Sequence, residues 1–240
     1  MAKRFIVFQH GPWDGLGRLL TEAAFIAKVR LDVLEVWHQP PPLLSPYDGL
    51  MVLGGSPNIN QERQFPFLRP EKEAISRSIA EDRPYLGFCL GHQLLAEALG
   101  AKIGANPAPS IGIVRGYLTH DGRRHQIFRG FDKTMPLFKW HTQAVQEPLP
   151  RAIQVLATSV DCPVEAISVK DRPHLVGLQF DNYAAAPGDV ANWLTKDERW
   201  LATLNNGEIA PPSILDNVRQ YSDALRADFN RLFTNFLELA

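Results

Sequence analysis

The sequence predicts an α/β protein with a mostly parallel central sheet, antiparallel additions to that sheet and a helical C-terminal extension. Up to about residue 90, strand-like apolar runs alternate with amphipathic stretches, which is typical of parallel strands joined by crossover helices. From residue 101 to 180, short strands are punctuated by Gly and Pro, and after Pro187 the pattern is helical. A chain of 240 residues provides one large domain, or one domain with an appendage.

The N-terminal elements alternate between strand and helix. Residues 4–9, 31–36 and 49–53 are predicted strands, and the first helix has one apolar face made of Leu16, Leu20, Ala23 and Ala27. A second helix is predicted over residues 70–81, because Pro70 suits a first turn and Arg83-Pro84 closes the segment. A short apolar strand, residues 85–88, then runs into Cys89.

The second half of the chain is predicted to add antiparallel strands and then helices. The added strands are residues 111–118, 153–157, 166–169 and 175–180. Helices are predicted over residues 190–204 and 215–239, separated by residues 205–207 and by Pro211-Pro212. We therefore expect one domain over residues 1–194 and a helical extension, residues 195–240, packed on it.

Composition excludes several classes of function. Lys+Arg 25 against Asp+Glu 26 leaves a net charge of −1, so no global positive field attracts nucleic acid or a membrane surface. No apolar run reaches the ~18 residues of a membrane span. The two cysteines, Cys89 and Cys162, suit neither a disulfide framework nor a structural metal site. We expect a cytoplasmic protein without a metal or cofactor.

The most informative string, Gly87-Phe88-Cys89-Leu90-Gly91-His92-Gln93, lies between a buried strand and a helix. This pattern predicts a nucleophile elbow, because glycines two before and two after the nucleophile relieve clashes in a strained turn. A thiol at a helix N-terminus is favoured as thiolate, and the Leu90 amide is free to bind an oxyanion. The alternative is a tight joint that merely buries a small apolar cysteine.

A second loop could complete such a site. Gly54-Gly55 ends the third predicted strand, and paired glycines let backbone amides approach a ligand closely. Beside the elbow, this loop would supply the second oxyanion donor. Alone it is equally typical of an ordinary turn between strand and helix.

These segments, together with Trp140-His141 and residues 176–180, follow the order and approximate spacing of a known family. Over residues 3–194 the chain resembles class I glutamine amidotransferases, most of all the stand-alone relatives of the GMP synthase glutaminase domain. The resemblance implies a flavodoxin-like three-layer fold and attack by Cys89 on the amide of glutamine or a γ-glutamyl compound. It further implies oxyanion binding by the Gly55 and Leu90 amides, and substrate binding by Gly54, Gln93 and a loop containing His141, Thr142 and Gln143.

The chain departs from the family at the catalytic partners. The family follows its Gln-Phe pair with a catalytic His, any residue, and an orienting Glu, whereas this chain has Asp181, Asn182 and Tyr183. A base in this reaction needs a pKa near neutrality, and an ionised Asp181 would also raise the pKa of the thiol. In the loop at His141 the family usually continues with Gly-Asp instead of Thr-Gln, which weakens the case for glutamine recognition.

No other histidine is an obvious replacement for the base. His92 is most simply a packed, hydrogen-bonded residue of its helix, and His141 is the better candidate. His10 lies at the correct sheet edge but has nothing else to recommend it. We expect no histidine nitrogen within hydrogen-bond reach of the Cys89 sulfur.

Two functions follow from these observations. The first is hydrolysis of glutamine or a γ-glutamyl amide through Cys89 with a weakened base. The second is a catalytically impaired glutamine-binding or regulatory protein. The chain has no Gly-x-x-x-x-Gly-Lys-Ser/Thr string, so any synthase that accepts ammonia is expected to be a separate partner.

Overall fold

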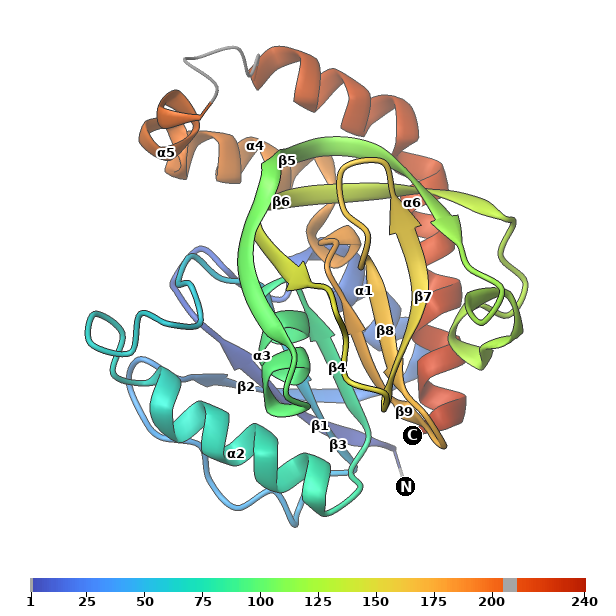
Figure 1. Ribbon diagram of the computed structural model, residues 1–240. Helices are drawn as coiled ribbons and strands as arrows, with labels where there is room; N and C mark the ends of the chain where they lie inside the picture. The colour runs from blue at the N-terminus through green and yellow to red at the C-terminus, as the bar shows by residue number, and fades with distance from the viewer. Residues whose placement is uncertain (1, 205–210) are drawn as a thin grey trace.

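The computed structural model describes residues 2–204 and 211–240, whose strands form one nine-stranded sheet in the order β2-β1-β3-β4-β9-β8-β7-β5-β6 (Figure 1). Five strands pair in parallel: β2 (Arg30–Glu35), β1 (Arg4–Gln9), β3 (Gly49–Val52), β4 (Tyr85–Phe88) and β9 (Arg172–Leu178). Four more extend the sheet with antiparallel pairing: β8 (Ala166–Val169), β7 (Ile153–Ser159), β5 (Lys102–Leu118) and β6 (Thr134–Gln146). The predicted mostly parallel sheet with antiparallel additions is confirmed.

Helices cover both faces of the parallel part, which makes the three layers. The helices α1 (Gly17–Ala27) and α6 (Pro211–Leu239) lie on one face, and α2 (Leu68–Ala80) and α3 (Leu90–Ala98) lie on the other (Figure 1). Successive side chains of a strand point to opposite faces. Accordingly Phe5 and Val7 of β1 belong to the first apolar core, and Ile6 and Phe8 belong to the second. The expected flavodoxin-like arrangement is confirmed.

The segment around Trp140 differs from the expectation. Residues Trp140 to Gln143 are not in a loop but in β6, where Trp140 pairs with Ile111 and His141 with Ser110 of β5. The polar residues Lys139, His141 and Gln143 obscure the apolar pattern of this strand. Because β6 is the last strand in the sheet order, it also tolerates Pro136.

The C-terminal helices also differ in their bounds. The predicted helix over residues 190–204 is two helices, α4 (Pro187–Lys196) and α5 (Glu198–Thr203). Pro211 and Pro212 do not separate helices but lie in the first turn of α6, where a missing N–H costs nothing. The predicted break at residues 205–207 lies outside the described residues. The described part of the chain also contains three short 3-10 turns: η1 (Gly122–Arg124), η2 (Gln126–Phe128) and η3 (Asn182–Ala184).

The long helix α6 packs its apolar side on the sheet and α1. Phe229, Phe233 and Phe236 are buried, and the Phe236 ring lies 5.8 Å from the ring of Phe5 in β1. The helix therefore contributes directly to one of the two cores. The division of the chain at residues 194 and 195 stays a prediction.

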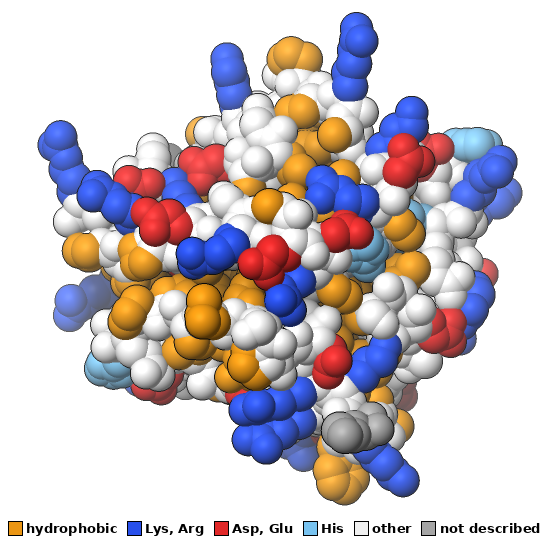
Figure 2. Space-filling model, turned by 90° about the horizontal axis from the view of Figure 1, so that it is seen from below, with side chains coloured by type: hydrophobic (Ala, Val, Ile, Leu, Met, Phe, Trp, Pro, Cys, Tyr) orange, Lys and Arg blue, Asp and Glu red, His pale blue; other side chains and the backbone are white. Residues whose placement is uncertain are grey.

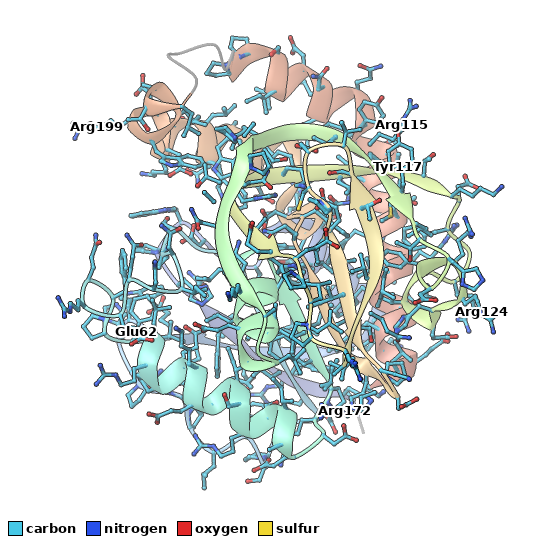
Figure 3. All side chains as sticks on the ribbon, in the orientation of Figure 1. Glu62, Arg115, Tyr117, Arg124, Arg172 and Arg199 are labelled. Carbon is cyan, nitrogen blue, oxygen red and sulfur yellow. The ribbon has the colours of Figure 1, made fainter. Side chains whose placement is uncertain are left out.

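The surface carries both charges. Lys and Arg side chains are interspersed with Asp and Glu over the face seen in Figure 2. Arg124 and Arg199 point away from the body of the molecule (Figure 3). Within residues 2–204 and 211–240, no helix has both the length and the apolar character needed to cross a membrane.

Phe236→Ala is expected to lower the free energy of unfolding by about 3–5 kcal/mol, because it removes a fully buried ring and leaves a cavity under α6. Tyr221→Ala is the matched control, since that ring lies on the same helix but is 39% exposed, and a change below about 1 kcal/mol is expected. Urea denaturation followed by circular dichroism measures both values. Equal losses in the two variants would contradict this assignment of the buried face.

Candidate active site

Cys89 lies in a sharp turn between β4 and α3 with φ 45° and ψ −100°, a backbone conformation that L residues rarely adopt. A Cβ on Gly91 would lie 2.3 Å from the Val52 oxygen, and one on Gly87 would lie 2.5 Å from the carbonyl carbon of Gly91. Only glycine allows β3, β4 and α3 to approach this closely. The predicted strained elbow is therefore present.

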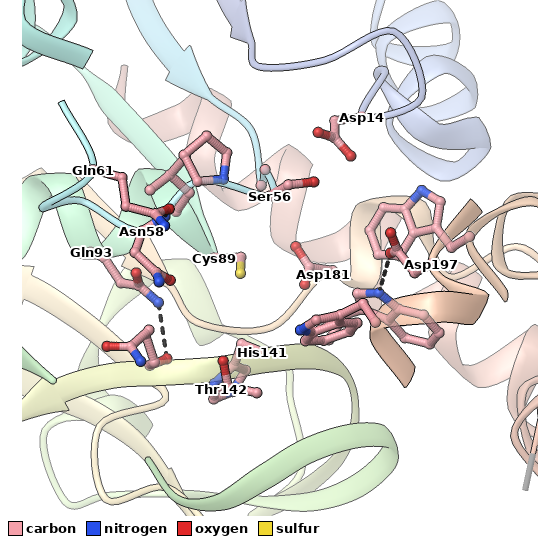
Figure 4. A pocket seen from close by; sticks show the side chains of 18 residues that line it. Asp14, Ser56, Asn58, Gln61, Cys89, Gln93, His141, Thr142, Asp181 and Asp197 are labelled. Atoms are coloured by element: carbon pink, nitrogen blue, oxygen red, sulfur yellow. Dashed lines mark hydrogen bonds between the residues drawn. The ribbon is translucent and has the colours of Figure 1, made fainter. Parts of the chain in front are cut away.

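The turn opens into a pocket of about 370 Å³ (Figure 4). The pocket has the size of ordinary small-molecule sites, and the predicted Gly54-Gly55 loop and the Trp140 to Gln143 segment both contribute to its wall. Its lining residues come from five regions of the chain: Asp14; Gly54, Gly55, Ser56, Pro57, Asn58 and Gln61; Cys89, Leu90 and Gln93; Trp140, His141, Thr142 and Gln143; Asp181, Trp193, Asp197 and Trp200.

The Cys89 thiol is held in its neutral form. Burial raises the pKa of the thiol well above its ordinary value, and the nearby Asp181 carboxylate raises it further. The backbone amide of Leu90, at the start of α3, acts in the opposite direction. Desolvation and the carboxylate outweigh the helix terminus, so the thiolate is a minor species near neutral pH.

Asp181 and Tyr183 pack against the thiol at Gly54. A Cβ on Gly54 would lie 2.9 Å from Asp181 Oδ1, 3.2 Å from Tyr183 Oη and 3.4 Å from Cys89 Cβ. The Gly54 N–H donates to Tyr183 Oη at 3.2 Å, and the Tyr183 ring lies 4.7 Å from that of Phe88. Asp181 Oδ1 is buried without a hydrogen-bond partner among the described residues. Burial raises the pKa of Asp181 well above its ordinary value, and the neighbouring Asp14 raises it further.

A buried His10–Glu71 pair orients the Gly54-Gly55 peptide. His10 Nδ1 lies 3.0 Å from the Gly54 carbonyl oxygen, and Nε2 lies 2.8 Å from Glu71 Oε1. Burial lowers the pKa of His10, but the Glu71 carboxylate outweighs this effect and raises the pKa above its ordinary value. Nδ1 is then a donor to the Gly54 carbonyl. Since C=O and N–H point in opposite directions across a trans peptide, the Gly55 N–H points away from His10.

No described histidine nitrogen forms a hydrogen bond with Cys89, as expected from the sequence. His92 is fully buried, and burial lowers its pKa to about 3. A backbone hydrogen bond at Gly177 acts in the opposite direction, and the expected hydrogen bonding of the His92 ring stays a prediction. The His141 imidazole lies within 4.8 Å of Cys162 and Glu165, and burial lowers its pKa well below its ordinary value.

The remaining predicted binding residues lie beside the thiol on β6 and α3. Gln93 Nε2 donates to the Gln143 carbonyl oxygen at 3.0 Å and to Gln179 Oε1 at 3.2 Å. The first bond fixes α3 against β6 and the second fixes it against the residue that follows β9, while Thr142 also lines the pocket (Figure 4). Substrate binding by these residues stays a prediction.

One group of side chains has donor types that suit a metal. His141, Cys162 and Glu165 offer ligand atoms within 4.8 Å of one another. Glu165, however, already forms a buried ion pair with Lys139 and accepts from Ser159. A cation at this position would meet the Lys139 ammonium, so the group fits a metal poorly.

Several pocket residues were not predicted from the sequence. Asp14 follows β1 by a few residues, and Asp197 separates α4 from α5. Trp193 and Trp200 lie on α4 and α5, and both rings pack near Trp140, with centroids 5.8 Å and 6.2 Å from it. The position of Asp14 just beyond the carboxyl end of a parallel strand was an available signal. The positions of Asp197, Trp193 and Trp200 depend on how α4 and α5 pack, for which the sequence offers no local signal.

Comparison with known proteins agrees with this geometry. The model of the family Glutamine amidotransferase class-I matches residues 18–180. A glutamine-hydrolysing GMP synthase subunit from Sulfurisphaera tokodaii is 30% identical over 148 residues, covering 62% of this chain and 73% of the relative. The glutamine amidotransferase-like protein YfeJ of Salmonella typhimurium is 34% identical over 131 residues, covering 53% of this chain and 54% of its own. The chain thus spans about half the length of YfeJ.

A solved structure has the same fold. The crystal structure of a glutamine amidotransferase from Thermotoga maritima aligns with a TM-score of 0.87 and 23% sequence identity, and the alignment covers 99% of both chains. Fold and site together define an α/β protein with a cysteine at a nucleophile elbow. The chain belongs to the class I glutamine amidotransferase family, because the family model covers more than half of it.

Asp181→Asn is expected to lower the pKa of the Cys89 thiol, because it removes the carboxylate that opposes thiolate formation. In a Cys162→Ser background, alkylation by iodoacetamide near pH 8 should then be several-fold faster, since the thiolate is the nucleophile. Mass spectrometry of the alkylated chain over a pH series measures the change. Asp48→Asn, an exposed acid remote from the pocket lining, is the control and should leave the rate unchanged. Identical pH profiles for all variants would mean that Asp181 does not oppose thiolate formation.

Proposed function

We propose that this chain binds a γ-glutamyl amide, of which glutamine is the simplest, and hydrolyses it slowly through Cys89. The observation that carries the proposal is the pairing of an intact elbow with a buried carboxyl, Asp181, beside the thiol. The elbow supplies a nucleophile and oxyanion donors, whereas Asp181 is a poor base.

The reaction needs only groups that border the pocket. The sulfur adds to the amide carbon while its proton passes to a carboxyl oxygen of Asp181, which gives its own proton to the leaving nitrogen. The C–N bond then breaks, and the acyl group remains on Cys89 as a thioester. Water hydrolyses the thioester, which releases the carboxylic acid and restores the thiol. Gly55 and Leu90 are proposed to donate their amide hydrogens to the oxyanion, a contribution that acts in both steps.

The same arrangement explains why turnover is expected to be slow. A carboxyl group takes up and returns a proton near neutral pH less effectively than an imidazole, and general acid–base catalysis contributes roughly 10²–10⁴-fold. Burial also raises the pKa of Cys89, which reduces the thiolate fraction. The pocket therefore supports binding better than it supports chemistry.

A partner synthase stays a prediction. The relative from Sulfurisphaera tokodaii is described as one subunit of a glutamine-hydrolysing GMP synthase, which supports a separate ammonia-accepting chain for this protein as well. The second candidate, a regulatory glutamine-binding protein, is favoured by the replacement of both catalytic partners at Asp181 and Tyr183.

The double variant Asp181→His with Tyr183→Glu is expected to release ammonia from glutamine at least about tenfold faster than the wild type, equivalent to roughly 1.4 kcal/mol of barrier. The change supplies an imidazole base and a carboxylate that orients it. Asp181→His alone should help less, because Tyr183 offers the imidazole no carboxylate. Ammonia release over time, with Cys89→Ala as the blank and thermal melting to check folding, measures each rate.

Two results would contradict the proposal. Rapid wild-type hydrolysis that disappears in Cys89→Ala would mean that a base other than Asp181 operates. A folded double variant no faster than the blank, combined with no detectable glutamine binding by the wild type, would mean that the pocket does not accept γ-glutamyl amides.

A further inference from the structure

The pocket has two chemically different sides, separated by Cys89 (Figure 4). On one side lie the side-chain amides of Asn58, Gln61 and Gln93. On the other side lie three carboxyls, of Asp14, Asp181 and Asp197, together with the indoles of Trp140, Trp193 and Trp200. A substrate lying across the thiol would place its two ends in these two environments.

The three carboxyls lack a cationic partner. None of the three forms an ion pair with a described residue. Asp181 is 1% exposed, and its Oδ1 accepts no hydrogen bond from a described residue. The charges of His10 and Lys139 act on Asp14 and Asp181, but both cations are already paired with the buried carboxylates of Glu71 and Glu165. Asp181 also interacts with the Cys89 thiol, whereas Asp14 and Asp197, which lie near each other, have no ion-pair partner among the described residues, and such a pair of acids favours a cation supplied by a ligand.

The electrostatics of the group agree with this view. Burial raises the pKa of Asp14 to about 6, with the charge of His10 opposing the shift and that of Asp197 adding to it. Burial also raises the pKa of Asp197, although the hydrogen bond from Trp140 opposes this shift. Arg199, two residues from Asp197, is exposed and points away from the molecule (Figure 3). A ligand cation would therefore meet no competing positive charge from α5.

The indoles provide the second half of a cation site. Trp140 Nε1 donates to Asp197 Oδ2 at 2.8 Å, which fixes the carboxylate at the edge of the aromatic group. Trp193 is 7% exposed, and Trp140 and Trp200 are half-buried, so parts of these rings face the pocket. An ammonium beside an indole face gains roughly 0.5–2 kcal/mol, with more when it is desolvated.

From this juxtaposition we propose that the preferred substrate is a γ-glutamyl amide whose leaving amine carries a second, positively charged amino group. The inference rests on the proposed function, since the glutamyl part occupies the amide-lined side and the scissile carbonyl lies over Cys89. The ammonium then lies between Asp14, Asp197 and the indole of Trp200. Hydrolysis releases a diamine in place of ammonia, and the atoms balance as in the mechanism given above.

Isothermal titration calorimetry on Cys89→Ala, which binds without turnover, tests this specificity. Four ligands are compared: glutamine, and γ-glutamyl amides of equal length that end in an ammonium, a methyl or a carboxylate group. The amide that ends in an ammonium is expected to bind at least about tenfold more tightly than the one that ends in methyl, and the carboxylate most weakly. The methyl-ended amide keeps the length and the glutamyl group, so the ratio isolates the charge.

Substitutions test which residues produce the preference for the ammonium-ended amide. In Asp197→Asn, whose amide oxygen still accepts from Trp140, the ratio of ammonium to methyl affinity is expected to fall to about threefold or less. Asp14→Asn should reduce it in the same way. Glu198→Gln removes an exposed carboxylate from the next position, outside the pocket lining, and should keep the full ratio.

The results separate this inference from the proposed function. Equal affinity for the ammonium and methyl amides, with glutamine still bound, would overturn the inference and leave γ-glutamyl binding intact. Binding of none of the four ligands would overturn the proposed function and this inference with it. Loss of the preference in Glu198→Gln as well would show a general charge effect and would also overturn the proposed site.

Discussion

The pocket depends on one backbone conformation, that of Cys89. Its positive φ costs about 1–3 kcal/mol, and the surrounding strands have to enforce it. The Cys89 N–H donates to the Leu178 oxygen of β9 at 2.8 Å, and the Gly91 N–H donates to the Leu53 oxygen after β3 at 3.3 Å. The parallel sheet thus holds the elbow from both sides. The conformation of this turn therefore decides where the sulfur lies relative to the other pocket residues.

At this turn, burial favours the neutral forms of the Cys89 thiol and of the Asp181 carboxyl beside it. Burial disfavours the thiolate and the Asp181 carboxylate alike, and each ionised form would repel the other. The His10–Glu71 pair is different, since its opposite charges stabilise each other beneath the Gly54-Gly55 loop. The loop that we propose binds the oxyanion therefore lies next to a thiol whose ionisation is disfavoured by burial. Under the proposed function, this combination would separate binding of an amide from rapid cleavage of it.

The fold and the elbow could be predicted from the sequence, because each depends on local patterns, whereas the loss of the catalytic partners stays a prediction. Gly87 and Gly91 mark the turn, and Asp181 and Tyr183 occupy positions counted from a neighbouring strand. The place of Trp140 in a strand could not be predicted, since polar residues break the apolar pattern of β6. The roles of His10 and Asp197 depend on contacts between segments far apart in the chain. Polar residues that are buried in a site such as this one produce no periodic pattern in the sequence.

The tryptophan group beside Asp197 makes the pocket intrinsically fluorescent. Three of the five tryptophans of the chain line this one pocket, and two of their ring pairs lie 5.8 Å and 6.2 Å apart. Indole emission responds to the polarity around the ring and to nearby charge. A molecule that displaces water from this wall, or alters the hydrogen bond from Trp140 to Asp197, changes the emission of most of the fluorophores at once. The protein therefore carries an intrinsic reporter of occupancy at the position where a ligand would enter, and no attached dye is needed to follow it.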